Sequence, residues 1–304
     1  MRIITLGAAA GGGLPQWNCT CANCSALRSH QTNVQARTQS QIAFTGNSDA
    51  WFLINASPDL REQLNSVPEL QPDRAKGLRN TPIAGVILTS ADLDHVLGLL
   101  LMREFTPMRI FATKAVSSVL QSNRFFQMLD RMPGQSRWSP IEPGVSFSPG
   151  KDVICTPIAL SGSLPAYVGV KERTSLNAAD PVVGLILEAA QGARVAYIPA
   201  LSSAPSALKE LLATCSVLLL DGTFWSDDEL QRFQPGTPLA RSMGHMPISG
   251  PDGSLETFRD LAAVRKIYTH LNNTNPILNE DSPERRAVYD AGWEVACDGL
   301  EITI

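Results

Sequence analysis

The feature that most constrains the fold is the interleaving of strand-like and helix-like segments along all 304 residues. Segments 83–90 ("IAGVILTS") and 216–224 ("SVLLLDGTF") are typical of buried strands, and segments 98–105, 114–129, 204–215 and 255–264 are typical of helices. The final segment, 293–304, is typical of a strand pair. No repeat, low-complexity tract or linker divides the chain. This pattern predicts an α/β architecture in which helices cover sheets, and we expect a single domain over residues 1–304.

Composition limits the classes of partner. The chain is 44% hydrophobic and 18% charged, with a net charge of -4 and a pI of about 5.6, so we expect no nucleic-acid partner. No apolar run reaches the roughly 18 residues of a membrane span. The start of the chain, "RIITLG" followed by glycines, is typical of a first strand and a loop rather than a signal peptide, and its glycine spacing lacks the P-loop pattern. We therefore expect a soluble, cytoplasmic protein.

The cysteines are unevenly distributed. Cys19, Cys21 and Cys24 lie together in "CTCANC", whereas the other cysteines stand alone. Three thiols within six residues favour a structural zinc ion, although the Cys-x-x-Cys half would also suit thiol exchange or a buried cluster. The fourth ligand must come from a distant segment. Cys297, Asp298 and the neighbourhood of His270 are candidates, and the sequence does not choose between them.

Polar clusters follow several of the predicted strands. Each has a simpler explanation, since an aspartate can cap a helix and a histidine can be hydrogen-bonded in a loop. However, residues that follow neighbouring strands converge on one edge of a sheet, where α/β proteins place their chemistry. The candidates are Asp92, Asp94, His95, Asp221, His245 and His270.

These residues carry a resemblance. "ILTSADLDHVLGLL" resembles the Thr-His-x-His-x-Asp-His-x-x-Gly-Leu motif of the metallo-β-lactamase superfamily, with Ser90 and Asp92 in place of its first two histidines. "GGGLPQWNC", "DLDH" and "HLNNTNP" are most similar to the coenzyme PQQ synthesis protein B family. The resemblance covers essentially the whole chain. It implies an αββα sandwich of two mixed β-sheets flanked by helices.

The departures from the superfamily pattern concern the metal ligands. Ala200 stands where the bridging aspartate would be, and the chain has four histidines in all, too few for the usual two-zinc hydrolase site. By the resemblance, Asp94, His95 and His270 match ligand positions, and Asp92 occupies one with altered chemistry. We expect Asp92 and Asp94 to project to the same side of an extended segment. Two carboxylates and two imidazoles suit a single Fe(II) better than paired zinc ions.

The resemblance implies an iron-dependent oxygenase of PQQ biosynthesis that hydroxylates the tyrosine ring of a Glu-Tyr precursor. His245 and Asp221 would then lie near the site but outside the metal shell, with His245 positioning the substrate or moving a proton. Two alternatives stay open: a mononuclear zinc hydrolase, and a non-catalytic carrier or transport factor for PQQ or its precursor. We expect a small-molecule or dipeptide substrate and leave a homodimer open.

Overall fold

A computed structural model describes the chain except for residues 47, 105, 171–172, 174–175 and 177–178. The chain packs into two compact units. Unit 1 comprises Met1–Leu6, Gln41–Gly192 and Gly299–Ile304, and unit 2 comprises Gly7–Ser40 and Ala193–Asp298. The single domain over residues 1–304 stays a prediction.

The described residues of unit 1 form a seven-stranded mixed sheet in the order β13-β1-β2-β3-β4-β5-β6. The β13–β1 and β2–β3 pairs are antiparallel, and β3 to β6 run parallel. The strands are β1 (Arg2–Gly7), β2 (Gln41–Thr45), β3 (Trp51–Ile54), β4 (Ile83–Ile87), β5 (Met108–Ala112), β6 (Ser136–Pro140) and β13 (Glu301–Thr303). A further antiparallel pair joins β7 (Val153–Ala159) to β8 (Val183–Ala189).

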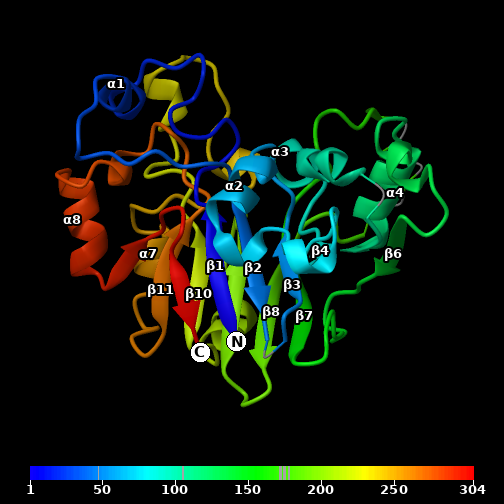
Figure 1. Cartoon of the computed structure of the whole chain (residues 1–304). Coiled ribbons are helices and arrows are strands. Elements are labelled where there is room, and N and C mark those ends of the chain that lie inside the picture. The colour runs from blue at the N-terminus through cyan, green and yellow to red at the C-terminus, as the bar shows by residue number, and fades with distance from the viewer. Residues whose placement is uncertain (47, 105, 171–172, 174–175, 177–178) are drawn as a thin grey trace. The chain divides into compact units, whose positions relative to one another are not determined.

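Short helices of unit 1 pack on this sheet through one apolar cluster. Leu53, Val86 and Ile110, from three neighbouring strands, are fully buried together with Leu99 and Val116 of the helical segments. In Figure 1, α3 and α4 lie at the end of the sheet where β4 and β5 lead into them. The helices are α2 (Leu60–Ser66), α3 (Leu93–Val96), α4 (Lys114–Ser122) and the 3-10 turns Pro68–Leu70, Arg74–Lys76, Leu97–Met102 and Phe126–Asp130.

Unit 2 is built around parallel strands in the order β12-β11-β10-β9. Tyr268 of β11 and Trp293 of β12 stack with ring centroids 4.1 Å apart, and both rings are fully buried. The strands are β9 (Arg194–Ile198), β10 (Val217–Asp221), β11 (Arg265–Thr269) and β12 (Trp293–Val295). The helices are α1 (Ala22–Arg28), α6 (Ser206–Leu212), α7 (Ser254–Thr257), α8 (Pro283–Asp290) and the 3-10 turns Leu230–Arg232, Arg241–Met243 and Pro276–Leu278.

The C-terminal segment differs from the sequence expectation. Residues 293–304 were expected to form a strand pair with each other, and this is wrong. β12 pairs in parallel with β11, whereas β13 pairs antiparallel with β1. Gly299, with a φ of 85°, donates to the Thr5 carbonyl, so the chain turns there into the sheet of unit 1.

Several predicted helices are shorter than expected. The helix expected over 98–105 is the 3-10 turn Leu97–Met102, and Phe105 lies outside the described residues. The helix expected over 114–129 ends at Ser122, because Asn123 adopts an extended conformation. The helix expected over 255–264 is the single turn α7.

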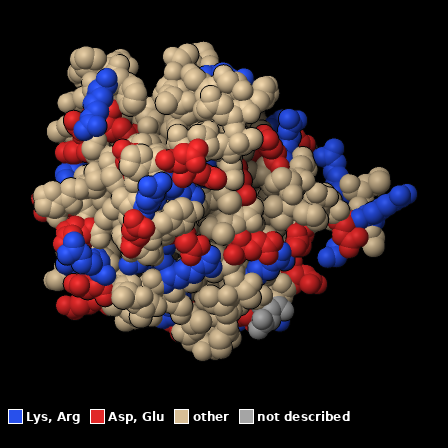
Figure 2. Space-filling view, turned by 90° about the vertical axis from the view of Figure 1, so that its left-hand side faces the viewer, with Lys and Arg blue, Asp and Glu red and all other residues tan. Residues whose placement is uncertain are grey.

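Charged side chains of both signs lie on the surface. On the face shown in Figure 2, Lys and Arg side chains are interspersed with Asp and Glu side chains. Among the described residues, no helix has both the length and the apolar character that crossing a bilayer requires.

Candidate functional site

The loop that follows β4 is anchored within unit 1 before it reaches the candidate ligands. The side-chain oxygen of buried Asn55 accepts from both the backbone N–H and the hydroxyl of Thr89, each at 2.9 Å. The Thr89 carbonyl accepts from the N–H of Val183 at 2.8 Å. The loop therefore starts from a fixed backbone position.

Ser90 links Asp92 to His95. Its hydroxyl donates to Oδ2 of Asp92 at 2.7 Å, and its oxygen lies 2.9 Å from Nδ1 of His95. Since the single hydroxyl hydrogen goes to the carboxylate, the imidazole donates through Nδ1. A metal would then bind His95 through Nε2, as is usual where a neighbouring acceptor fixes the tautomer of a ligating histidine.

Helix capping does not account for the two aspartates. Asp92 occupies the N-cap of α3, yet its side chain makes no capping hydrogen bond. Asp94 belongs to α3 itself, so the expectation that Asp92 and Asp94 project from one extended segment is wrong. Oδ2 of Asp94 lies 3.9 Å from Nε2 of His95, which brings Asp94 and His95 together.

Close backbone packing holds α3 in place. The His95 carbonyl accepts from Ala56, and the N–H of Gly98 donates to the Ala56 carbonyl. A Cβ at Gly98 would lie 2.2 Å from the Ser57 carbonyl oxygen, so only glycine fits at this position of the motif.

In unit 2, the parallel register places Asp221 and His270 at the same edge of the sheet, since Asp221 lies opposite Thr269. Oδ2 of Asp221 accepts from Nδ1 of His245 at 2.8 Å and from the N–H of Leu201 at 2.9 Å. The rings of His245 and His270 stack, with centroids 5.4 Å apart. The structure thus brings Asp221, His245 and His270 together.

Thr223 repeats in unit 2 the arrangement of Ser90. Its hydroxyl donates to Oδ1 of Asp221 at 2.6 Å, and its oxygen lies 2.8 Å from Nδ1 of His270. His270 therefore donates through Nδ1, and a metal would bind it through Nε2. His270 has a φ of 56°, a conformation that costs energy for a side-chain-bearing residue, so the surrounding bonds must hold it.

Asp221 is fully buried and charged. Burial alone would raise the pKa of Asp221, but the neighbouring His245 and His270 and the bond from Thr223 outweigh it and lower that pKa. A buried carboxylate at Nδ1 orients the His245 ring and makes Nδ1 a donor. Nε2 of His245 can therefore hold or release a proton.

The three clustered thiols meet at one asparagine of unit 2. The ligand atoms of Cys19, Cys21 and Cys24 lie within 4.8 Å of one another. Nδ2 of Asn273 lies 3.1, 3.5 and 3.4 Å from their sulfur atoms, respectively. Asn23 of α1 donates to the Asn273 carbonyl at 2.9 Å, which fixes this loop against α1.

Ionising all three thiols together requires a cation. Burial opposes ionisation of Cys19, but hydrogen bonds from Cys21 and Asn273 lower its pKa on balance. Burial raises the pKa of Cys21 to about 12, although a backbone hydrogen bond from Cys24 acts in the opposite direction. Three thiolates this close become stable only when a metal ion compensates their charge, so the cluster fits a zinc ion.

Asn273 lies in the neighbourhood of His270 that the sequence offered for the fourth zinc ligand. Asp298, another candidate, is half-buried and accepts from Ala8 at 3.1 Å and from Thr38 at 2.7 Å. Cys297 is not part of the thiol cluster among the described residues. Asparagine was missed because zinc ligands are sought among Cys, His, Asp and Glu.

The predicted iron ligands fall into both units. Asp92, Asp94 and His95 belong to unit 1, and His270 belongs to unit 2. Their assembly around one ion stays a prediction. Sequence reasoning gave no role to Thr223, and it treated Ser90 only as a lost histidine. Both residues share a sequence signal near a strand end. Ser90 lies two residues before Asp92, and Thr223 lies two residues after Asp221.

Comparisons with known proteins cover the whole chain. A family model described as "Beta-lactamase superfamily domain" matches residues 50–271. The chain is 40% identical over 304 residues to Coenzyme PQQ synthesis protein B of Methylobacterium sp. (strain 4-46), with 100% of each chain covered. It is 41% identical over 307 residues to the protein of the same name from Pseudomonas fluorescens (strain Pf0-1), again with 100% of each chain covered.

Solved structures agree with these relatives. The crystal structure of Zn²⁺-bound PqqB from Methylobacterium extorquens matches with a TM-score of 0.93 and 38% identity over 100% of both chains. A diphosphatase from the PhnP family matches with a TM-score of 0.67 at 20% identity, over 99% of this chain and 97% of that chain, which supports the fold alone. The predicted metallo-β-lactamase-like α/β fold, with two mixed sheets flanked by helices, is confirmed.

Proposed function

Because the chain belongs to the coenzyme PQQ synthesis protein B family of the β-lactamase superfamily, we propose that it acts in PQQ synthesis as an iron-dependent oxygenase. Its substrate is the tyrosine ring of a Glu-Tyr precursor. The observation that carries the proposal is the set of candidate ligands after β4. Asp92, Asp94 and His95 lie in the motif that contributes histidine ligands in a hydrolase of the superfamily.

The proposed ligands are Asp92, Asp94, His95 and His270. Two aspartates neutralise a divalent ion, and hard oxygen donors suit iron better than zinc. The hydroxyls of Ser90 and Thr223 support this assignment, because each engages Nδ1 of its histidine and so presents Nε2 as the metal-binding atom. The assignment of His270 to this set rests on the family motif.

Iron, when bound, would supply the electron-transfer chemistry that makes dioxygen reactive. In the overall reaction one oxygen atom enters a ring C–H bond as a hydroxyl group. The other oxygen atom is reduced to water, which consumes two electrons from an external reductant and two protons. The protein must therefore provide a route for protons and exclude competing water.

His245 is the residue best placed to hold a proton. Asp221 accepts from its Nδ1, so the proton to be transferred is carried on Nε2. The His245 side chain is 15% exposed, and the Asp221 side chain is fully buried. Asp221 therefore acts as a positioning residue, and His245 exchanges protons with substrate or solvent.

We also propose a structural zinc ion at Cys19, Cys21 and Cys24. The amide of Asn273, turned so that Oδ1 faces the metal, would supply the fourth ligand, because its nitrogen and oxygen are close in size and exchange places by rotation. Such an ion would tie the loop before α1 to the loop that begins at His270.

A zinc hydrolase is the second candidate function. The relative from Methylobacterium extorquens was crystallised with Zn²⁺. The Asp221–His245 pair would also suit the protonation of a leaving group. In that case a metal-bound hydroxide would cleave an ester or amide, without consuming oxygen.

Metal titration separates these functions. The protein is loaded anaerobically with Fe(II) or with Zn(II), and oxygen uptake and peptide hydrolysis are then measured with a Glu-Tyr peptide and ascorbate. The oxygenase proposal predicts substrate-dependent oxygen uptake with iron alone. Hydrolysis with zinc and no oxygen uptake with iron would establish the second candidate, and the absence of both reactions would favour a carrier.

A further inference from the structure

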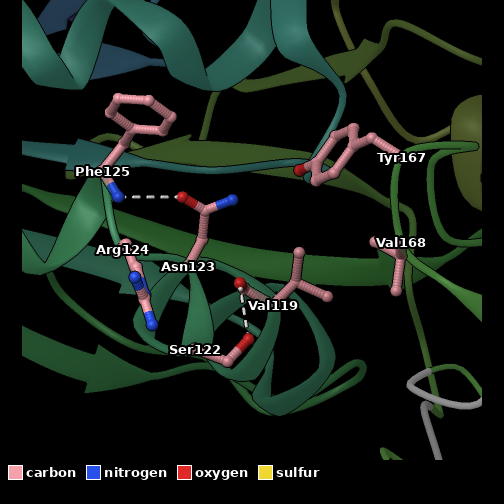
Figure 3. Close-up of a pocket in the computed structure, with 7 residues that line it drawn as sticks. All are labelled: Val119, Ser122, Asn123, Arg124, Phe125, Tyr167 and Val168. Carbon is pink, nitrogen blue, oxygen red and sulfur yellow. Dashed lines mark hydrogen bonds between the residues drawn. The ribbon is translucent and has the colours of Figure 1, made fainter.

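A cavity of about 300 Å³ opens in unit 1 beside the C-terminal end of α4. This volume is at the low end for small-molecule sites and suits one aromatic ring with its substituents. The lining combines apolar and hydrogen-bonding side chains from α4, the turn after it and the loop that follows β7 (Figure 3): Val119, Ser122, Asn123, Arg124, Phe125, Tyr167 and Val168.

One wall of the cavity contacts the loop that carries Asp92. The Tyr167 hydroxyl donates to the Ala91 carbonyl at 2.5 Å, and Ala91 directly precedes Asp92. Burial and then the Asp92 carboxylate raise the pKa of Tyr167 to about 12. Tyr167 therefore stays neutral, and its oxygen can accept a hydrogen bond from a ligand.

The apolar part of the lining can hold a ring. Val119 is 4% exposed and Val168 is 3% exposed, so both belong to the core and present methyl groups to the cavity. By contrast, Phe125 is 73% exposed although it is a large apolar residue. An exposed aromatic ring at a cavity edge offers a face against which a second ring can pack.

The polar side chains of the lining have defined positions. Oδ1 of Asn123 accepts from the N–H of Phe125 at 3.0 Å, which fixes the amide so that its NH₂ group points toward the Tyr167 side of the cavity (Figure 3). Arg124 lies at one edge of the cavity and is exposed. Within the described part of the chain, Arg124 forms no ion pair, so its charge is available to an anion.

We propose that this cavity binds the tyrosine end of the substrate. Asn123 donates to the phenol oxygen, the phenol hydroxyl donates to Tyr167, and Arg124 pairs with the C-terminal carboxylate. This inference rests on the proposed function for the identity of the substrate. It adds the residues that select a phenolic ring carrying a carboxylate, which the metal ligands alone do not specify. A site built to hydrogen-bond a hydroxyl group rejects an analogue that lacks it.

Isothermal titration calorimetry tests the subsite without turnover. The anaerobic protein is titrated with the peptides Glu-Tyr, Glu-Phe and Glu-Tyr amide. We expect Glu-Phe, which lacks the phenol hydroxyl, and Glu-Tyr amide, which lacks the C-terminal carboxylate, each to bind about tenfold more weakly than Glu-Tyr. Equal affinities for the three peptides, or no binding of Glu-Tyr, would overturn the subsite.

Variants assign the effects to residues. Arg124→Gln should weaken Glu-Tyr binding about tenfold and leave the binding of Glu-Tyr amide unaffected, because the amide lacks the C-terminal charge that Arg124 recognises. Asn123→Asp keeps the acceptor for Phe125 and removes the donor, so it should reduce the preference for Glu-Tyr over Glu-Phe, to which Tyr167 still contributes. The control is Arg61→Gln, at an exposed arginine of α2 outside the cavity, and an equal loss there would contradict the assignment.

The subsite and the oxygenase can fail separately. If the peptides bind with the expected dependence on Arg124 and Asn123 but no oxygen is consumed, the subsite stands and the proposed reaction is wrong. If oxygen is consumed and the KM for Glu-Tyr is the same in wild type, Arg124→Gln and Asn123→Asp, the reaction stands and the subsite is wrong.

Discussion

The Ser90 oxygen lies 2.9 Å from Nδ1 of His95, and the Ser90 hydroxyl donates to Asp92. The serine that replaces a histidine of the superfamily motif therefore has a structural role. It joins a carboxylate to an imidazole and fixes which ring nitrogen faces a metal. Thr223 does the same for Asp221 and His270 in unit 2.

Removal of the Ser90 hydroxyl should weaken metal binding. Ser90→Ala leaves Nδ1 of His95 without its nearest acceptor, so we expect the affinity for Fe(II) to fall about 10- to 100-fold. Ser90→Thr keeps a hydroxyl group and should restore binding. Anaerobic metal titration provides the measurement, and Ser117→Ala on α4 provides the control. An unchanged affinity in Ser90→Ala would show that the serine does not orient the ligand.

His245 and His270 should respond differently to truncation. We expect His270→Ala to lose the active-site metal, whereas His245→Ala keeps it and loses turnover, because Nδ1 of His245 is engaged by Asp221. Metal analysis after gel filtration, combined with oxygen uptake, separates the two effects. If His245→Ala loses metal as completely as His270→Ala, then His245 is itself a ligand.

The thiol cluster should hold zinc independently of the active site. Cys21→Ser removes one thiolate, so both the zinc content and the melting temperature should decrease. Cys297→Ser changes a cysteine outside the cluster and should leave both quantities unchanged. Zinc analysis and thermal melts of the two variants provide the test. A Cys21→Ser protein with full zinc and the wild-type melting temperature would refute the site.

Glu229 should make stability depend on pH. Burial raises the pKa of Glu229 from 4.5 to about 7, although Thr274 and Trp225 donate to its carboxylate. The folded state therefore keeps a proton that the unfolded chain has lost. The free energy of unfolding should decrease as the pH rises from 4.5 through 7, by on the order of 3 kcal/mol in total.

Urea unfolding at several pH values measures this effect. Glu229→Gln should flatten the slope relative to wild type, and Glu210→Gln, at an exposed glutamate of α6, should not. A comparison between variants cancels the pH dependence of the other groups. Parallel pH profiles for wild type and Glu229→Gln would show that Glu229 ionises normally in the folded protein.

The sequence predicts the strands well because their apolar runs are long and bounded by glycine and polar residues. β4 and β10 fall within the predicted ranges 83–90 and 216–224. It predicts pairing poorly, because periodicity does not identify a strand's partner. β12 and β13 are adjacent in the chain and yet pair with different strands.

The candidate site was predictable to a similar extent. The family motif identifies Asp92, Asp94, His95 and His270 as candidate ligands. It does not identify Ser90 and Thr223 as their supporting groups, or Asn273 as the residue that meets the thiol cluster, since a hydroxyl or an amide has many other uses. The hydrogen bonds in the folded chain show what these three residues do there.

The origin of the product oxygen tests the central claim most directly. The iron-loaded protein is incubated with the Glu-Tyr peptide and ascorbate under ¹⁸O₂ in ordinary water, and the peptide is analysed by mass spectrometry. The account predicts that each new ring hydroxyl carries one ¹⁸O atom and that a double variant, Asp92→Ala with His270→Ala, forms no such product. An unmodified peptide in the wild-type reaction, or a ring hydroxyl that carries only ¹⁶O, would contradict it.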